Sequence, residues 1–326
     1  MEEINIGTAV STAPGRSIGD LRIGDLPDGE AITTPVVILR GAGEGPLLWL
    51  HGCVHGDEYC GTFVIHEMLR SVAPEALSGT IVALPMLNVT ASQRNRRMSP
   101  FESMSHGDLN RCFPGKADGS LTEQMGHAIY SQLKAHADYF IDFHTALTGD
   151  VRWALYANAD GETGQKAAGI AKAFGYKSTL PAPTDILGGS AMMTAAKDGI
   201  PSFIVEAGGI GPAFDAATVR DTAERLRNVL RHLQMLPGEV TDHGPQYDFS
   251  NFAWVNATRG GLFVRAVKCG QRLQPGTVLG HYYDVFGDMV EEAVSPFAGI
   301  VLAINAGPVM SNGEVLVHVG LDPQDI

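Results

Sequence analysis

The stretch Leu47-Leu48-Trp49-Leu50-His51-Gly52-Cys53-Val54-His55-Gly56-Asp57-Glu58 joins a short apolar run to a glycine-containing turn and then to a segment of helical composition. The apolar run predicts a buried strand that ends near Leu50, and the segment from Glu58 to Val72 predicts a helix. Open α/β sheets bind their ligands at the carboxyl ends of strands. This stretch therefore predicts both an α/β fold and a functional site at the junction between strand and helix.

The same alternation of apolar runs and helical segments continues from Pro35 to about Leu236. It is the pattern of a central sheet with helices on its faces. The further strands that we expect cover residues 36–39, 81–84, 139–143, 153–156 and 202–205, and the further helices cover residues 121–135, 162–174 and 215–236.

The pattern changes after Leu236, where Pro237-Gly238 and His243-Gly244-Pro245 break the helix and short β-like runs follow, separated by glycine turns. We therefore expect a catalytic α/β domain over residues 1–240 and a β-rich appendage over residues 241–326, resembling a small barrel or sandwich. The appendage could cover the mouth of a cleft or mediate pairing into a homo-oligomer. The sequence leaves both alternatives open.

Composition excludes several classes of partner. Lys and Arg number 23 against 36 Asp and Glu, so the net charge of −13 argues against binding to nucleic acid. No apolar run approaches the roughly 18 residues that a membrane span requires. The acidic start Met1-Glu2-Glu3-Ile4-Asn5 does not resemble a signal peptide, and the four cysteines are scattered. These features predict a cytoplasmic chain with reduced thiols.

A histidine and a glutamate three residues apart form the first candidate for chemistry. If the predicted helix has opened by then, His55 and Glu58 project from one face and can hold one ion. His144 closes another predicted strand, with Asp142 on the same face of that strand as a partner for its ring. Two histidines and a glutamate leave zinc an open position for water. Taken singly, each histidine is more often an ordinary polar residue, and Cys53 is a weaker alternative ligand.

A metal-bound water needs a base, and Glu206 is the candidate because it follows an apolar run and precedes Ala207-Gly208-Gly209. A carboxylate at a strand end before glycines can enter a cleft. A glutamate at the end of a strand is, however, more often simply exposed to solvent. Spacing alone does not decide between the two.

Arginines gather in a loop of this acidic chain, at Arg94, Arg96, Arg97 and Arg111, with Asn110 beside the last of them. Arginine holds a carboxylate through two parallel hydrogen bonds, so the loop could bind an anionic substrate. We favour a solvated loop for Arg94 and Arg96, and a binding role for Arg111.

Four of these motifs, in this order, resemble the aspartoacylase and succinylglutamate desuccinylase family, which is related to the zinc carboxypeptidases. They are His51-Gly52-Cys53-Val54-His55-Gly56-Asp57-Glu58, Asp108-Leu109-Asn110-Arg111 with Phe113-Pro114-Gly115, Asp142-Phe143-His144-Thr145, and Glu206-Ala207-Gly208-Gly209. The resemblance covers most of the chain. It implies a mixed central sheet with helices on both faces, as in zinc carboxypeptidases, and a smaller C-terminal all-β domain.

The resemblance also implies roles for individual residues. His55, Glu58 and His144 match the ligands of one zinc ion, and Glu206 matches the general base that later acts as an acid. The residues that match the substrate-binding pair are Asn110 and Arg111. An upstream arginine of the family polarises the scissile carbonyl, and here we expect Arg97, with Arg94 and Arg96 as the alternatives.

The implied activity is zinc-dependent amide hydrolysis that removes an N-acyl group, of acetyl or succinyl type, from a small-molecule N-acyl amino acid. The stretch Arg97-Met98-Ser99-Pro100 resembles the branch that deacetylates N-acetyl-diaminobutyrate, but residues 101–107 depart from it and leave the substrate open. The alternatives are a metallocarboxypeptidase acting on short peptides and a catalytically inactive relative that only binds ligands.

Overall fold

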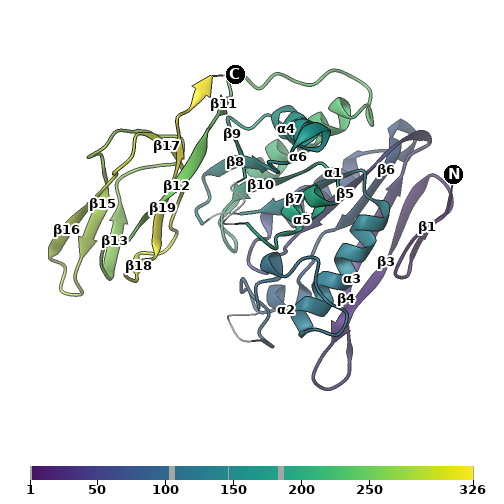
Figure 1. Cartoon of the computed structure of the whole chain (residues 1–326), viewed down its shortest axis with the longest axis horizontal. Helices are drawn as coiled ribbons and strands as arrows, with labels where there is room; N and C mark the ends of the chain where they lie inside the picture. Colours follow the sequence, from purple (N-terminus) through teal and green to yellow (C-terminus); the bar gives the residue numbers. More distant parts are fainter. Residues whose placement is uncertain (1, 103–106, 146, 183–186, 326) are drawn as a thin grey trace.

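A ten-stranded mixed sheet forms the centre of the computed structural model, which describes residues 2–102, 107–145, 147–182 and 187–325 (Figure 1). Its strands, in spatial order, are β20 (Gln324–Asp325), β11 (Tyr247–Asp248), β9 (Ser178–Pro181), β8 (Val151–Tyr156), β10 (Ser202–Gly208), β7 (Tyr139–His144), β5 (Gly43–Gly52), β6 (Ser78–Leu84), β4 (Ala31–Arg40) and β3 (Gly15–Asp25). The neighbours β6, β5, β7 and β10 are parallel. Strand β8 runs antiparallel to β10 and parallel to β9, and β4 runs antiparallel to both of its neighbours, β6 and β3. The carboxyl ends of β5, β7 and β10 therefore meet at one edge of the sheet.

Helices cover both faces of this sheet because its strands are apolar on both sides. The helices are α1 (Cys60–Ser71), α2 (Val89–Ser92), α3 (Leu121–His136), α4 (Gly161–Phe174), α5 (Ala191–Lys197), α6 (Ala216–His232) and the short 3-10 turns η1 (Pro74–Ala76) and η2 (Leu109–Arg111). In β5, Leu48 and Leu50 pack with α1 and α6, whereas Trp49 packs on the opposite face with α3 and α5. Over the described ranges, none of these helices is both long and apolar enough to cross a membrane.

The C-terminal strands form two further sheets, each four-stranded and antiparallel. One contains β12 (Asn251–Asn256), β19 (Val315–Leu321), β17 (Gly299–Ile304) and β14 (Arg272–Leu273), and the other contains β16 (Met289–Val294), β15 (Val278–Tyr283), β13 (Gly261–Arg265) and β18 (Val309–Met310). Their apolar residues make a core of their own around Leu279 and Val317. Figure 1 shows these strands as a lobe beside the part of the large sheet that carries β8 and β9.

The predicted architecture is confirmed: a mixed central sheet with helices on both faces, and antiparallel β strands at the C-terminal end. The predicted domain boundary near residue 240 stays a prediction. Strands β11 and β20, which lie beyond that boundary, pair with each other at the edge of the large sheet, and β11 also pairs with β9.

Some element boundaries were wrong. The helix expected from Glu58 begins at Cys60, so the residues before it lie in a turn. The helix expected to reach Leu236 ends at His232, where Gln234 has a positive φ of 58° that a helix cannot accommodate. The N-terminal hairpin of β1 (Ile4–Ile6) and β2 (Ala9–Ser11) and the edge strand β3 were not expected.

Candidate active site

A turn, rather than a helix face, brings His55 and Glu58 together. The backbone N–H of Glu58 donates to the carbonyl of His55 at 3.2 Å, and the His55 Nδ1 lies 2.8 Å from the Glu58 Oε1. The turn packs closely on α2, because a Cβ atom at Gly56 would lie 2.2 Å from the backbone of Ala91. Only glycine fits at this position. The prediction that the two side chains lie together is correct, although its helical explanation is wrong.

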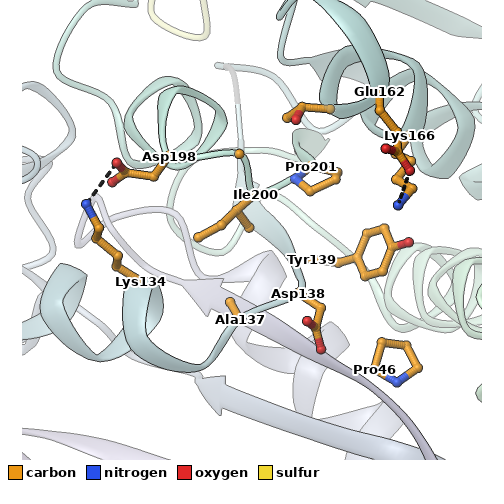
Figure 2. A pocket seen from close by; sticks show the side chains of 12 residues that line it. Pro46, Lys134, Ala137, Asp138, Tyr139, Glu162, Lys166, Asp198, Ile200 and Pro201 are labelled. Atoms are coloured by element: carbon orange, nitrogen blue, oxygen red, sulfur yellow. Dashed lines mark hydrogen bonds and ion pairs between the residues drawn. The ribbon is translucent and has the colours of Figure 1, made fainter.

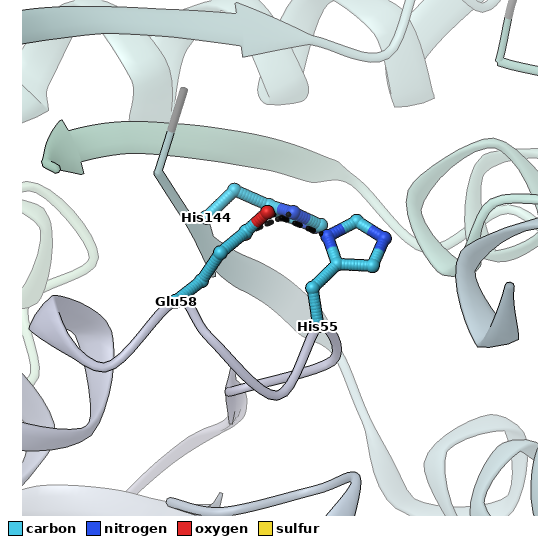
Figure 3. Close-up of side chains that lie close together, drawn as sticks. All are labelled: His55, Glu58 and His144. Carbon is cyan, nitrogen blue, oxygen red and sulfur yellow. Dashed lines mark hydrogen bonds and ion pairs between the residues drawn. The ribbon is translucent and has the colours of Figure 1, made fainter. Parts of the chain in front are cut away.

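His144 reaches the same place from the carboxyl end of β7, which is hydrogen-bonded to β5. Its Nδ1 lies 3.1 Å from the Glu58 Oε2, and the backbone N–H of Thr145 donates to that oxygen at 3.0 Å. One ligand atom from each of His55, Glu58 and His144 lies within 4.8 Å of the others, and all three residues are buried (Figure 3). Two imidazoles and a carboxylate converging in this way fit a zinc ion with an open position.

The charges in this cluster are strongly coupled. Burial favours the neutral form of Glu58, but His55 and His144 outweigh it and hold the pKa of this carboxyl well below its ordinary value. Burial likewise opposes a charge on His144, but the carboxylates of Asp142 and Glu58 outweigh it and raise the pKa of that imidazole well above its ordinary value. The cluster therefore favours a positive charge close to its carboxylates. A bound metal ion would supply such a charge.

Asp142 holds the other side of the His144 ring. Its Oδ2 lies 3.1 Å from the His144 Nε2, and the Nδ2 of Asn110 lies 3.3 Å from the same nitrogen. The contact with Asp142 is an ion pair by distance, since neither of its carboxylate oxygens makes a hydrogen bond within the described residues. A carboxylate placed in this way can orient a ring whose other nitrogen binds a metal. The arrangement leaves Nδ1 as the nitrogen that faces the cluster.

Glu206 is aligned with His144 across the parallel strands β10 and β7. Its Oε2 is buried and has no hydrogen-bond partner within the described part of the chain. Burial, reinforced by the charges of Glu58 and Asp142, raises the pKa of this carboxyl to about 8. A carboxyl that exchanges its proton near neutral pH is suited to act as a general base.

All three loop arginines are exposed to solvent, but of the three only Arg97, with 42% of its side chain exposed, lines the cavity that contains the cluster. Its guanidinium lies 3.3 Å from the Glu58 Oε1 and 3.1 Å from the Asp108 Oδ2. Burial opposes the charge, but these carboxylates together raise the pKa of Arg97 above its ordinary value. The arginine therefore stays charged beside the cluster.

Asp108 is a site residue that the sequence analysis did not single out. Its Oδ1 lies 3.1 Å from the His55 Nε2 and also accepts a hydrogen bond from the backbone of Asn110, at the start of η2. Burial would favour the neutral acid, but His55, Arg97 and Arg111 outweigh it and hold the pKa of Asp108 well below its ordinary value. Its position two residues before Asn110, in the motif Asp108-Leu109-Asn110-Arg111, was the feature of the sequence that could have indicated its role.

The two predicted substrate-binding residues differ in their surroundings. Asn110 is buried, and its Oδ1 accepts a hydrogen bond from the backbone of Ala191 at 3.1 Å. Arg111 is exposed and donates to the carbonyl of Asn110 at 2.8 Å, and most of its guanidinium donors remain available as far as the described residues are concerned. Both residues line the cavity that contains the cluster.

Cys53 is not part of the cluster. Its thiol donates to the carbonyl of Glu58 at 3.3 Å and lies 3.2 Å from the hydroxyl of Thr62. Burial raises the pKa of this thiol to about 11, whereas a metal ligand must be a thiolate. The weaker alternative ligand is therefore not supported.

The cluster lies in a cavity of about 580 Å³ that two parts of the chain enclose. The metal-binding candidates, Arg97, Asn110, Arg111 and Glu206 line one part of it. Strands β12 and β19 of the C-terminal sheets contribute Phe252, Trp254 and His318 to its wall. The C-terminal strands therefore cover part of the site, in agreement with the first of the two roles considered for the appendage.

A second pocket, of about 710 Å³, lies at the opposite edge of the sheet, where β7 and β10 begin. Figure 2 shows two ion pairs in it, Lys134 with Asp198 at 2.9 Å and Lys166 with Glu162 at 2.8 Å. The remaining carboxylate, Asp138, accepts a hydrogen bond from the backbone N–H of Leu47 at 2.7 Å. These side chains are engaged with each other and with the backbone, so the candidate chemistry lies in the first cavity.

Comparison with known proteins adds independent evidence. Residues 44–233, which include all seven predicted site residues, match the succinylglutamate desuccinylase/aspartoacylase catalytic domain. The chain is 31% identical over 273 residues to the N-alpha-acetyl-L-2,4-diaminobutyric acid deacetylase of Halomonas elongata, a match that covers 82% of this chain and 77% of that protein.

Solved structures resemble nearly the whole chain. A succinylglutamate desuccinylase/aspartoacylase from Rhodobacter sphaeroides is 26% identical, with a TM-score of 0.84 and 96% of each chain covered. The product-bound ectoine utilization protein EutE (DoeB) from Ruegeria pomeroyi is 25% identical, also with a TM-score of 0.84, over 95% of this chain and 97% of that one. The similarity therefore includes the C-terminal strands.

Proposed function

The chain belongs to the succinylglutamate desuccinylase/aspartoacylase family, and we propose that it is a zinc-dependent amidohydrolase that removes the acyl group from a small N-acyl amino acid. The observation that carries the proposal is the convergence of three buried ligand atoms beside Glu206, whose buried Oε2 has no hydrogen-bond partner among the described residues. That arrangement holds a cation and a base side by side, which hydrolysis of an amide requires.

In this proposal His55, Glu58 and His144 hold one zinc ion per chain. The ion, when bound, supplies Lewis acidity toward water and toward the amide carbonyl. Asp142 keeps the His144 ring in its binding orientation, and Asp108 does the same for His55 from the other side of the cluster. These two carboxylates also limit the rotation of the rings.

Glu206 takes the proton of the attacking water and then passes it to the leaving nitrogen. Its place beside His144 and its raised pKa support this role. Proton transfer by a positioned group contributes roughly a hundred- to ten-thousand-fold in rate. Arg97, which is charged and borders the cluster, donates to the oxyanion that develops on the carbonyl.

Arg111 anchors the carboxylate of the amino acid, with Asn110 beneath it. The exposed guanidinium can reach a ligand in the cavity, and it can hold a carboxylate through two parallel hydrogen bonds. Fixing the carboxylate determines which amide lies beside the cluster. We propose the cytoplasm as the compartment, where the thiols of this chain stay reduced.

The experiment that tests the function is a hydrolysis screen with and without a chelator. N-acetyl, N-succinyl and longer N-acyl amino acids are compared with dipeptides, and N-acetyl-diaminobutyrate is included because the Halomonas relative is a deacetylase of that compound. We expect release of free amino acid from N-acyl substrates, loss of activity with the chelator and recovery with zinc. A preference for dipeptides would favour a carboxypeptidase, and an inert zinc-loaded protein would favour a ligand-binding relative.

A further inference from the structure

One part of the wall of the active-site cavity is built of aromatic rings. Trp153 comes from β8, Phe252 and Trp254 come from β12, and His318 comes from β19. All four line the same cavity as His55 and His144. The mechanism proposed above uses none of them.

These rings contact one another in a continuous layer. His318 stacks on Phe252 with 6.0 Å between ring centroids and an angle of 9° between planes, and it lies 5.9 Å from Trp254. Trp153 meets Phe252 edge-on at 6.1 Å. Trp254 and His318 are directly opposite each other in the register of β12 and β19, so the sheet itself holds the layer in place.

The layer carries no charge. Burial lowers the pKa of His318 to about 4, so this imidazole is neutral near pH 7. The carboxylate nearest in sequence, Glu314, lies in the cavity lining but is exposed, and it already accepts hydrogen bonds from the backbone of Ser311 and from Asn305. The remaining carboxylates of the lining, Glu58 and Glu206, belong to the proposed metal centre.

Aliphatic side chains complete this side of the cavity. Leu147, Leu155, Ile204 and Val315 are all part of the lining. A surface of rings and aliphatic groups favours an apolar ligand group because such a group leaves water when it binds. A charged group would lose its hydration here without gaining an ion pair.

We propose that the substrate carries an uncharged apolar or aromatic group, larger than a methyl group, that packs against Trp254, Phe252 and His318. The inference rests on the proposed function, since it places the amide at the cluster and this group at the aromatic wall. The group is either the side chain of the amino acid or an extended acyl chain. Both have the same chemistry, and substrates can distinguish them.

The test compares kcat/KM of the zinc-loaded full-length protein for two short series. The first keeps the acetyl group and varies the amino acid through alanine, leucine, phenylalanine and diaminobutyrate. The second keeps glycine and replaces acetyl with benzoyl. We expect the apolar member of one series to exceed its small counterpart on the order of 10- to 100-fold, as differences of a few methylene groups in an apolar pocket do.

Substitution of Trp254 links the preference to the wall. Trp254 is 41% exposed, so Trp254→Ala removes a ring without opening a core. We expect it to reduce the preferred-to-small substrate ratio on the order of 10-fold. Trp254→Glu adds a carboxylate and should move the ratio toward N-acetyl-diaminobutyrate. Phe286→Ala is the matched control, since Phe286 is 90% exposed in the turn between β15 and β16 and should leave the ratio unchanged.

The outcomes separate this inference from the proposed function. Apolar preference in the first series assigns the wall to the amino-acid side chain, and preference for benzoylglycine assigns it to the acyl group. Equal rates for small and apolar substrates, or a preference for N-acetyl-diaminobutyrate, would overturn the inference while leaving the deacylase function intact. Failure of the zinc-loaded protein to cleave any N-acyl amino acid would overturn both.

Discussion

Replacing Glu206 with glutamine should abolish turnover and, at the same time, stabilise the metal-free protein. The buried carboxylate has no hydrogen-bond partner at Oε2 in the described chain, and burial raises its pKa from 4.5 to about 8. The folded protein therefore binds this proton more tightly than the unfolded chain does. Consequently, the wild type loses stability as pH rises from the unfolded pKa toward the folded one.

The size of the effect follows from the two pKa values. Each unit between them corresponds to about 1.4 kcal/mol, so the raised pKa of Glu206 destabilises the fold by roughly 1 kcal/mol at pH 5.5 and roughly 4 kcal/mol at pH 7.5. Glutamine has a similar shape and does not ionise. The stability advantage of Glu206→Gln over the wild type should therefore grow by roughly 2 to 3 kcal/mol between these pH values.

Urea unfolding in the presence of a chelator, followed by tryptophan fluorescence at pH 5.5, 6.5 and 7.5, measures this difference. Glu44→Gln is the control, because it removes an exposed carboxylate at the opposite end of β5. With zinc restored, kcat of Glu206→Gln should fall on the order of 10²- to 10⁴-fold while zinc content stays the same. If the unfolding free energies of the wild type and the variant change with pH in parallel, burial does not raise the pKa of Glu206 and this reasoning is refuted. An unchanged kcat would show that Glu206 takes no part in proton transfer.

Three further changes probe the remaining parts of the site. Asp142→Asn should weaken zinc binding roughly 10- to 100-fold, because the His144 ring loses its orienting carboxylate, and competition with a fluorescent chelator measures this change. Arg111→Lys should raise KM on the order of 10-fold with a smaller effect on kcat, since lysine cannot hold a carboxylate through two parallel hydrogen bonds; a lowered kcat with unchanged KM would contradict this role. Zinc in excess should raise the unfolding free energy of the wild type by about 4 kcal/mol at 1,000 times Kd, and His55→Ala should lose this gain in thermal unfolding.

The sequence could predict the ligand cluster because its members stand at the ends of locally recognisable elements. His144 closes an apolar run, and His55 and Glu58 follow another run and a glycine. The start of the following helix was harder to place, because the turn that joins His55 to Glu58 has the same three-residue spacing as a helix face. Spacing identified the pair without identifying its conformation.

Other parts of the structure could not be predicted from local pattern. Strand β3 is an edge strand with charged residues and glycines, and Ile18 in it is 70% exposed, so it lacks the apolar run that indicates a buried strand. The aromatic wall depends on Trp153 meeting His318 across 165 residues, through the packing of β19 against the large sheet. Contacts over such separations are set by tertiary packing, which a local pattern does not contain.

The electrostatics of the site favour the metal ion that we propose. Glu58, Asp108, Asp142 and Glu206 gather in one buried region, and in the metal-free protein the charge that balances them comes from Arg97 and from a proton held on His144. A zinc ion at the cluster would replace that proton and lower the pKa of Glu206, because a nearby positive charge favours its ionised form. The same four carboxylates that repel one another without a metal would then be attracted to it. The four carboxylates therefore destabilise the fold when no positive charge lies between them, and they stabilise it when a cation is bound. Metal binding would in this way be coupled to ionisation of Glu206, the proposed base.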